Sequence, residues 1–408
     1  MRKINPHDFR VARRSTSRDI NRRIALNLVR EHQPISRADL ARHMSLGRGV
    51  VGVLINELIN EGLIYEGVTG EAARGRRPTF LHVKTDDRLV VAVDVRFSHT
   101  ALMLSDFSGR QIALETFKTN FDPAQLNAEL AKRILRLLKT HNAVSSCEGI
   151  GLVVPGMVDH HSGLVLNAPT LGWRDVDLRD NLAALTGLPV QVENAAKACA
   201  LAQMWLGRNE VGSAQNFAFV SVSDGVGVGL VINGELVRGQ HNIAGEFGHA
   251  PLSIDGPRCL CGATGCWEAY ISNIATLSRY FVRDSTKIRQ RDIFSTHNET
   301  FTIADLIARA RSGDARAITT LHSTGRYLGL GLATVLNIFN PNCVFIGGEI
   351  TAAWDLINDS VVAALSERAL TSGIAATTIR IAAASDYPRL RGAAALVAAP
   401  TFAAPRVA

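Results

Sequence analysis

The sequence predicts an α/β protein built from an N-terminal winged helix-turn-helix and a larger domain of two α/β lobes. Three observations support this fold. Short helical patterns followed by two short strands occupy the first eighty residues. Apolar strands alternate with helices from about Leu89 onward. The excess positive charge is confined to residues 1–80, which indicates two parts with different roles.

The composition is that of a globular chain without a membrane segment. Its 408 residues suffice for two or three domains with full-sized cores. The sequence contains no run of 18 apolar residues that would predict a membrane span. Its start, Met-Arg-Lys-Ile, lacks the apolar segment of a secretory signal. We therefore expect a cytoplasmic protein with no membrane partner, whose six cysteines are thiols or metal ligands.

Charge is distributed unevenly along the chain. Residues 1–80 carry 15 basic and 8 acidic side chains, a net charge of +7, whereas the rest of the chain holds 29 of each sign. This asymmetry is typical of a nucleic-acid-binding module, although a basic tail gives the same count. We expect residues 1–18 to form a basic arm that is disordered alone and orders on phosphates. Its arginines are Arg10, Arg13, Arg14 and Arg18.

The predicted winged helix-turn-helix covers residues 19–83. Apolar residues at helical spacing predict a first helix that stops at Pro34, namely Ile20, Ile24, Leu28 and Val29. Ser36 and Asp39 form a capping-box-like start for a second helix that reaches about Met44. A third helix follows the turn at Ser45-Leu46-Gly47 and ends at Gly62. Its expected inward face is Val50, Leu54 and Leu58.

Two short strands around a basic loop predict the wing. The strands are Leu63-Ile64-Tyr65 and Phe80-Leu81-His82-Val83, and the loop between them includes Arg74, Arg76 and Arg77. A narrow cationic loop suits the negative potential of an A·T-rich minor groove. The third helix would enter the major groove, where Arg48 is the one side chain at its start able to read a base edge. The alternative is a three-helix packing module without DNA.

The larger domain is predicted to cover residues 84–408. Its apolar strands or strand pairs recur at long spacing, at Val90–Asp94, Gly149–Val154, Phe217–Gly229 and Val344–Gly348. Helical patterns between them, such as Ala124–Thr140, predict two similar lobes around a cleft.

A histidine and three cysteines lie within 18 residues. His249 is followed after nine residues by Cys259, then by Cys261 and Cys266. Three thiolates and an imidazole at this spacing favour a closed tetrahedral zinc site, which would be structural because no coordination position stays open. The alternative is a group of unrelated reduced thiols. The other cysteines, Cys147, Cys199 and Cys343, fit apolar packing.

Further motifs accompany this cluster. They are Gly245-Glu246-Phe247-Gly248-His249, Gly265-Cys266-Trp267-Glu268, Pro155-Gly156-Met157-Val158-Asp159 and Val192-Glu193-Asn194-Ala195-Ala196-Lys197. Together they resemble the ROK family of bacterial repressors and sugar kinases over nearly the whole chain. The resemblance implies an actin-like ATPase (ribonuclease H-like) sugar-kinase fold with one zinc per chain in a loop at residues 245–268. It also implies that Asn194, Glu246, His249 and Glu268 surround a sugar, with His249 also on zinc. The alternative takes Glu246 and Glu268 as solvated surface acids.

The chain departs from the family's kinases at three places. Ala195 stands where they carry the aspartate that accepts the proton of the sugar hydroxyl. Their first phosphate loop, Asp-x-Gly-Gly-Thr, is replaced by Asp94-Val95-Arg96-Phe97-Ser98-His99-Thr100, which is bulky. Asp224 lies in the second glycine loop where kinases commonly have a hydroxyl. These losses favour a sugar-responsive transcriptional repressor without kinase activity. The alternatives are a bifunctional sugar kinase with a DNA-binding head and a metal-sensing regulator.

The expected partners are a double-stranded DNA operator and a small sugar or sugar phosphate. Winged helices commonly bind a pseudo-palindrome in pairs, which predicts a homodimer or a dimer of dimers. Ala195 removes a charge-assisted partner for the hydroxyl that kinases phosphorylate. A pentose, or a ligand that already carries a phosphate there, is therefore expected, with Lys197 or Arg96 as candidate partners of the phosphate. An ordinary hexose with a water in place of the carboxylate is the alternative.

Overall fold

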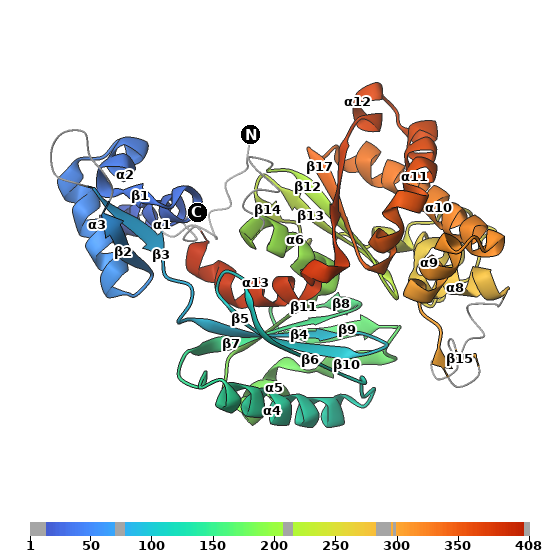
Figure 1. Cartoon of the computed structure of the whole chain (residues 1–408), viewed down its shortest axis with the longest axis horizontal. Coiled ribbons are helices and arrows are strands. Elements are labelled where there is room, and N and C mark those ends of the chain that lie inside the picture. The colour runs from blue at the N-terminus through green and yellow to red at the C-terminus, as the bar shows by residue number, and fades with distance from the viewer. Residues whose placement is uncertain (1–13, 70–77, 207–214, 283–294, 297–298, 404–408) are drawn as a thin grey trace. The chain divides into compact units, whose positions relative to one another are not determined.

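The computed structural model describes residues 14–69, 78–206, 215–282, 295–296 and 299–403 (Figure 1). The chain forms two units. The smaller comprises Met1–Leu89, Asp106–Arg110 and Ala398–Ala408, and the larger comprises Val90–Ser105 and Gln111–Val397. The wing arginines Arg74, Arg76 and Arg77, and the arm up to Arg13, lie outside the described residues. In the part of the chain that the structure describes, no helix is long and apolar enough to cross a membrane.

The smaller unit contains the three predicted helices and the two wing strands. The helices are α1 (Arg14–His32), α2 (Arg37–Met44) and α3 (Arg48–Asn60). Strands β2 (Ile64–Thr69) and β3 (Thr79–Val83) pair antiparallel, and β1 (Ile35–Ser36) joins β3. Ser36 and Asp39 make the expected capping box of α2.

Two details of the sequence prediction for this unit are wrong. Helix α1 begins at Arg14, inside the predicted arm, and the side chain of Arg18 pairs with Glu57 of α3. The inward face of α3 is Val51, Leu54, Ile55 and Leu58. Val50 is 51% exposed instead. A run of apolar residues in one short helix leaves the helical phase ambiguous by one position, and the packing against α1 and α2 decides it.

The C-terminal end of the chain contributes to the smaller unit. Helix α13 (Pro388–Phe402) ends there, and its last carbonyl groups lack partners within the helix. Side chains of α1 supply them: Arg23 donates to the carbonyls of Pro400 and Thr401, and Asn27 donates to Phe402 O at 2.7 Å. A guanidinium at this position also interacts favourably with the negative end of the helix dipole.

The larger unit has two five-stranded sheets, one in each lobe. The first has the order β11-β7-β4-β5-β6 and the second β14-β13-β12-β17-β18. The first sheet consists of β4 (Leu89–Val95), β5 (Thr100–Asp106), β6 (Gln111–Phe117), β7 (Cys147–Val154) and β11 (Val190–Asn194). The second consists of β12 (Phe217–Val222), β13 (Val226–Ile232), β14 (Glu235–Leu236), β17 (Cys343–Gly347) and β18 (Thr378–Ala382). The predicted α/β class and the two-lobed organisation are confirmed.

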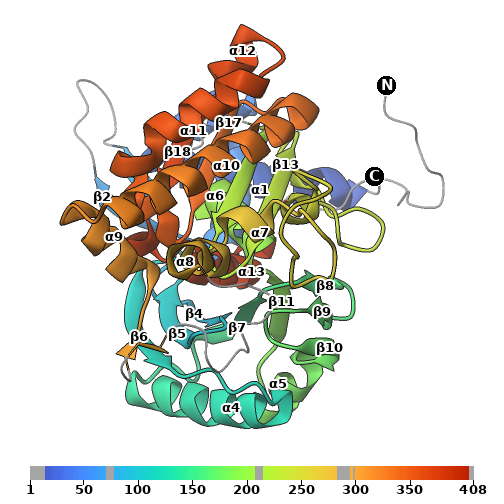
Figure 2. The same ribbon diagram turned by 90° about the vertical axis from the view of Figure 1, so that its right-hand side faces the viewer.

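Helices cover both faces of each sheet. Helices α4 (Pro123–Thr140) and α5 (Arg179–Thr186) lie on one face of the first sheet, and α13 lies on the other (Figures 1 and 2). In the second lobe, α6 (Ala195–Leu206) packs against β13. The core on the opposite face joins the sheet to α10 (Ala315–Phe339) and α11 (Trp354–Arg368). A short antiparallel sheet, β10-β9-β8, extends the first lobe. It comprises β8 (Met157–Val158), β9 (Leu164–Ala168) and β10 (Trp173–Asp177).

Candidate functional site

The predicted metal ligands come together in the loop between β14 and α7 (Glu268–Ile271). His249 ends the short helix η2 (Phe247–His249), and the cysteines follow in a tight turn closed by the backbone hydrogen bonds of Cys259 and Ala263. Pro251 and Cys266 form an isolated β-bridge that closes the base of the loop. Local chain geometry therefore assembles all four side chains.

The geometry of the four ligand atoms fits a tetrahedral zinc ion. They all lie within 4.8 Å of one another. Cys261 Sγ lies 3.7 Å from Cys266 Sγ, and Cys259 Sγ lies 3.8 Å from His249 Nδ1. Zn–S bonds of about 2.3 Å at tetrahedral angles separate two sulfurs by roughly 3.8 Å. The residues present therefore fit the metal that the sequence predicts.

Burial keeps two of the clustered thiols protonated when no metal is bound. Burial raises the pKa of the Cys266 thiol to about 11. Burial and the neighbouring carboxylate of Glu268 raise the pKa of Cys259, whose thiol donates to Glu268 Oε1 at 3.3 Å. These two thiols are therefore neutral at pH 7 without a positive ion, and a bound divalent metal would convert them to thiolate ligands.

Three of the four predicted sugar-binding residues, Glu246, His249 and Glu268, lie beside or within the metal cluster. His249 faces Cys259 with Nδ1, and its Nε2 lies 3.9 Å from a carboxylate oxygen of Glu246. Glu268 accepts a hydrogen bond of 2.8 Å from the backbone of Val226 at the start of β13. Burial raises the pKa of Glu246, and the charges of His249 and Lys197 oppose that shift. One imidazole thus connects the thiol cluster to a carboxylate.

The side chain of Asn194 is mostly occupied by hydrogen bonds to backbone groups of other residues. Its side-chain oxygen accepts from the amides of Ala196 and Lys197 at 2.9 and 3.1 Å, which caps the start of α6. Its amide nitrogen donates to Gly156 O at 2.7 Å. One amide hydrogen remains for a ligand, which is less than the sequence interpretation assumed.

A buried polar network beside Asn194 was not found from the sequence. Glu193 is fully buried and pairs with Arg238. Asn242 donates to Glu193 at 3.4 Å, and the ammonium of Lys197 donates to Asn242 O. Burial lowers the pKa of Lys197, while Glu193 and Glu246 oppose that change. Glu193 and Lys197 lie within the motif at residues 192–197, but Arg238 and Asn242 lie 45 and 49 residues beyond Glu193 and have no local pattern that points to it.

The second glycine loop serves packing. A Cβ on Gly229 would lie 2.5 Å from Ala196 O, and one on Gly227 would lie 2.7 Å from the Ala196 side chain. These two glycines let β13 approach α6 closely. The glycine spacing alone is therefore no evidence of a phosphate site.

The loop at residues 94–100, expected from the sequence to replace the kinases' first phosphate loop, contributes to a charge cluster that spans the two lobes. Arg96 Nε donates to Asp94 at 2.6 Å, and the same guanidinium pairs with Glu349, in the second lobe. Arg389 of α13 donates to the other oxygen of Asp94 at 2.8 Å. Asn273 of α8 (Asn273–Phe281) donates to Glu349 at 3.0 Å. The guanidinium of Arg96 is thus committed to two carboxylates.

The pKa shifts in this cluster have opposite signs. Burial opposes ionisation of Asp94 and Glu349, but the arginines outweigh it and lower both pKa values. Burial and the charge of Glu349 raise the pKa of Asp224 to about 6. Sequence reasoning flagged Asp94, Arg96 and Asp224 but missed Arg389, Glu349 and Asn273, which come from distant segments.

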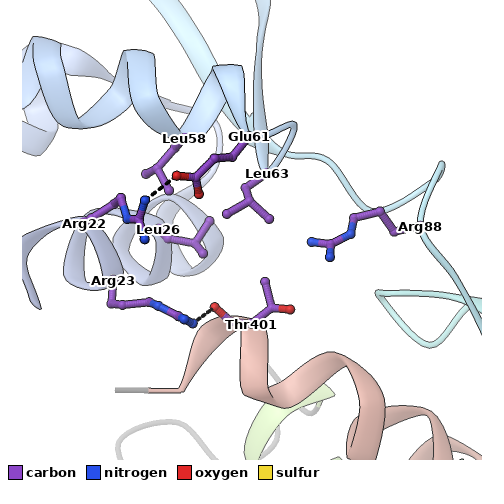
Figure 3. A pocket seen from close by; sticks show the side chains of 8 residues that line it. All are labelled: Arg22, Arg23, Leu26, Leu58, Glu61, Leu63, Arg88 and Thr401. Carbon is purple, nitrogen blue, oxygen red and sulfur yellow. Dashed lines mark hydrogen bonds and ion pairs between the residues drawn. The ribbon is translucent and has the colours of Figure 1, made fainter. Parts of the chain in front are cut away.

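The smaller unit offers an exposed cationic helix start and a small pocket. Arg48 is exposed at the first turn of α3. A pocket of about 270 Å³ lies among α1, α3 and the last residues of α13 (Figure 3). Arg22 points across it to Glu61, and Arg23 points to Thr401. Arg22 and Arg23 are thus committed to partners within the unit.

Comparison with known proteins identifies the family. The ROK family profile matches residues 90–399, and the chain belongs to this family. The xylose repressor of Caldicellulosiruptor bescii is 29% identical over 400 residues, with 96% of this chain and 98% of the repressor covered. A glucokinase of Halalkalibacterium halodurans is 31% identical over 277 residues and covers 66% of this chain and 83% of the kinase.

A solved structure agrees over almost the full length. The crystal structure of a ROK family transcriptional regulator, a homologue of the E. coli MLC protein, matches with a TM-score of 0.76 at 26% identity. The match covers 95% of this chain and 97% of the regulator. The predicted family and fold are therefore confirmed.

Proposed function

We propose that this protein is a DNA-binding transcriptional repressor whose affinity for its operator is set by a sugar bound in a domain that has lost kinase activity. The observation that supports this most strongly is the combination of two features in one chain. A winged helix-turn-helix precedes the ROK domain, and the charge cluster around Arg96 occupies the region of the family's first phosphate loop. The full-length similarity to repressors, against partial similarity to a glucokinase, supports the same function.

Two features of the side chains support the proposed loss of phosphoryl transfer. Ala195 has no proton acceptor for a sugar hydroxyl, and general-base catalysis is typically worth about 10²–10⁴ in rate. The guanidinium of Arg96 occupies the loop that follows β4 and is already paired with Asp94 and Glu349. A nucleotide would have to displace that pair and place its phosphates near Asp94, Glu349 and Asp224. The bifunctional kinase is therefore the less favoured function.

The sugar is proposed to contact Asn194, Glu246, His249 and Glu268. Fixed carboxylates and an amide bind sugar hydroxyls in pairs, and His249 Nε2 is free of the metal if Nδ1 holds it. His249, Cys259, Cys261 and Cys266 would hold one zinc ion, whose role is to fix the loop that carries these groups. For a phosphorylated ligand, the candidate cation is Lys197, which is buried and acts electrostatically on Glu246 but already donates to Asn242 O; Arg96 is paired with two carboxylates.

DNA binding is assigned to Arg48 and to the wing residues Arg74, Arg76 and Arg77, in a homodimer or a dimer of dimers. Coupling between sugar and DNA has a physical route in α13. Its first turn holds Arg389 in the charge cluster, and its last carbonyls are capped by α1. A shift of α13 in the larger unit would therefore alter its hydrogen bonds with α1, the first helix of the DNA-binding unit. The affinities for sugar and for DNA must then be linked reciprocally.

The test uses the full-length protein and duplexes that it selects from a random library. Titration with glucose, xylose, N-acetylglucosamine and the two hexose 6-phosphates should find one sugar that changes operator affinity by about 5- to 150-fold. A coupled assay should detect no phosphorylation of any of them. The Arg76→Ala, Arg77→Ala double variant should lower the slope of log K against log salt by about 0.9 for each lost phosphate contact. Phosphorylation at an ordinary kinase rate would instead establish the bifunctional enzyme.

A further inference from the structure

The outer face of α3 is apolar where helix-turn-helix proteins read DNA. Val50 and Val53 are 51% and 54% exposed, and they lie three residues apart on one side of the helix. They are separate from the inward stripe of Val51, Leu54, Ile55 and Leu58. Within the smaller unit, the first two turns of α3 thus present two isopropyl groups to solvent, with Arg48 before them.

The space beside these valines is open. A Cβ added at Gly49 or Gly52 would meet no atom within 4 Å. The outer face therefore consists of two valines separated by bare backbone, and it can approach another surface closely. The next exposed side chain, Asn56, already accepts a hydrogen bond of 2.9 Å from Arg37.

The charges around this face select an anionic partner. Arg48 is exposed at the start of α3, where the positive end of the helix dipole also lies. No acidic residue occupies the first turn, and the acids further along, Glu57 and Glu61, are paired with Arg18 and Arg22 of α1. Two exposed valines beside a cationic helix start fit the major groove of a duplex, where phosphates flank the methyl groups of thymine.

The major groove has a single apolar group, the 5-methyl of thymine. We propose that Val50 and Val53 recognise the methyl groups of neighbouring thymines in the operator, and that this contact sets the sequence preference of α3. The proposal rests on the proposed function and names the bases that the third helix reads. Valine offers no hydrogen bond, so a cytosine or guanine at these positions leaves its donor or acceptor unpaired against the helix.

The test removes only the methyl group. Operators are selected from random duplexes by the full-length protein, and each conserved thymine is then replaced by deoxyuridine. Burial of one methyl group corresponds to roughly a fourfold change in affinity. The unaltered protein should lose about fourfold at one or two neighbouring thymines in each half-site, and a G·C pair there should weaken binding on the order of tenfold or more.

Valine variants link that loss to α3. Val53→Ala should bind the thymine and uracil operators with equal affinity at its own position, and Val50→Ala should do the same at the neighbouring one. Val144→Ala is the matched control, because Val144 is 64% exposed and lies in the larger unit. Its sensitivity to uracil should equal that of the unaltered protein. Since Val50 and Val53 are half exposed, thermal unfolding should be nearly unchanged in all three variants.

Different failures have different meanings. Uracil substitution without effect at every thymine, or variants that keep full sensitivity to the methyl group, would overturn the reading by valine while leaving DNA binding intact. A change of oligomeric state in Val53→Ala, measured by light scattering, would assign this face to a second copy of the chain and also overturn it. Absence of binding to any duplex would remove the proposed function itself.

Discussion

Two clusters of the larger unit contrast in how they are built. The thiol cluster, His249 with Cys259, Cys261 and Cys266, comes from one loop within 18 residues. The charge cluster brings Asp94, Arg96, Asp224, Glu349 and Arg389 together from segments up to 295 residues apart. A local cluster depends on the geometry of one loop, whereas a dispersed cluster depends on how several distant elements pack together.

The largest effect is expected at the thiol cluster. Cys261→Ser should reduce bound zinc from one ion per chain toward none, because a closed four-ligand site loses its geometry with one thiolate. Structural zinc binding is worth on the order of 10 kcal/mol, so the loop that carries Glu246 and His249 should lose its order and the sugar response should vanish. Elemental analysis and a sugar titration measure both.

The control for this variant is Cys147→Ser. Cys147 is half-buried, with its sulfur 3.6 Å from Gly149 O, and serine can keep that contact. It should retain the metal and the sugar response. Native protein without zinc would contradict the metal assignment, and zinc retained by Cys261→Ser would show that this exposed thiol is no ligand.

The next effect is expected in the charge cluster. Arg389→Met leaves the buried carboxylate of Asp94 with Arg96 as its remaining guanidinium partner. Removing one partner of a buried ion pair typically costs about 3–5 kcal/mol of unfolding free energy. Urea unfolding measures it. The matched control is Arg391→Met in the same helix, whose guanidinium donates to the carbonyl oxygen of Leu206 at 3.3 Å. Equal losses in both variants would mean that the cluster has no special role in stability.

The contrast between the clusters also explains what the sequence could predict. The cysteine spacing and the Gly-Glu-x-Gly-His motif predicted the cluster of one histidine and three cysteines because all four residues lie in one loop. The capping box of Ser36 and Asp39 was predictable for the same reason. Arg389 and Glu349 have no local pattern, since only the packing of α13 and of the second lobe brings them to Asp94. The inward face of α3 was predicted wrongly for the same reason. Val50 and Val51 fit two different helical faces, and tertiary packing buries Val51.

A smaller effect is expected from pH. The pKa of Asp224 is raised to about 6 from 3.8, so between these values the folded chain binds more protons than the unfolded one. Stability from this group therefore falls as pH rises through that window. Asp224→Asn should gain about 1–3 kcal/mol relative to the unaltered protein between pH 4.5 and pH 7. Unfolding in urea at both pH values measures the difference.

Glu349, in the same cluster, should give stability the opposite dependence on pH. Its pKa is lowered because Arg96 outweighs its burial, so its contribution is present at neutral pH and lost as pH falls. Glu349→Gln should therefore lose stability relative to the unaltered protein as pH rises. The same pH dependence in both variants would show that the two carboxylates do not oppose each other.

The smallest effect is predicted for an ion pair outside both clusters. Arg326 and Glu367 form a two-pronged pair at 2.7 and 3.0 Å, but their side chains are 53% and 47% exposed. Water screens such a pair, so it contributes little to the free energy of unfolding. Arg326→Met should therefore change the unfolding free energy far less than Arg389→Met does, and 0.5 M salt should reduce that change further. Arg389→Met should keep its larger loss in the same salt, because its partner is 1% exposed. If both variants lose the same unfolding free energy and salt reduces both losses equally, burial does not distinguish the charge cluster from an exposed ion pair.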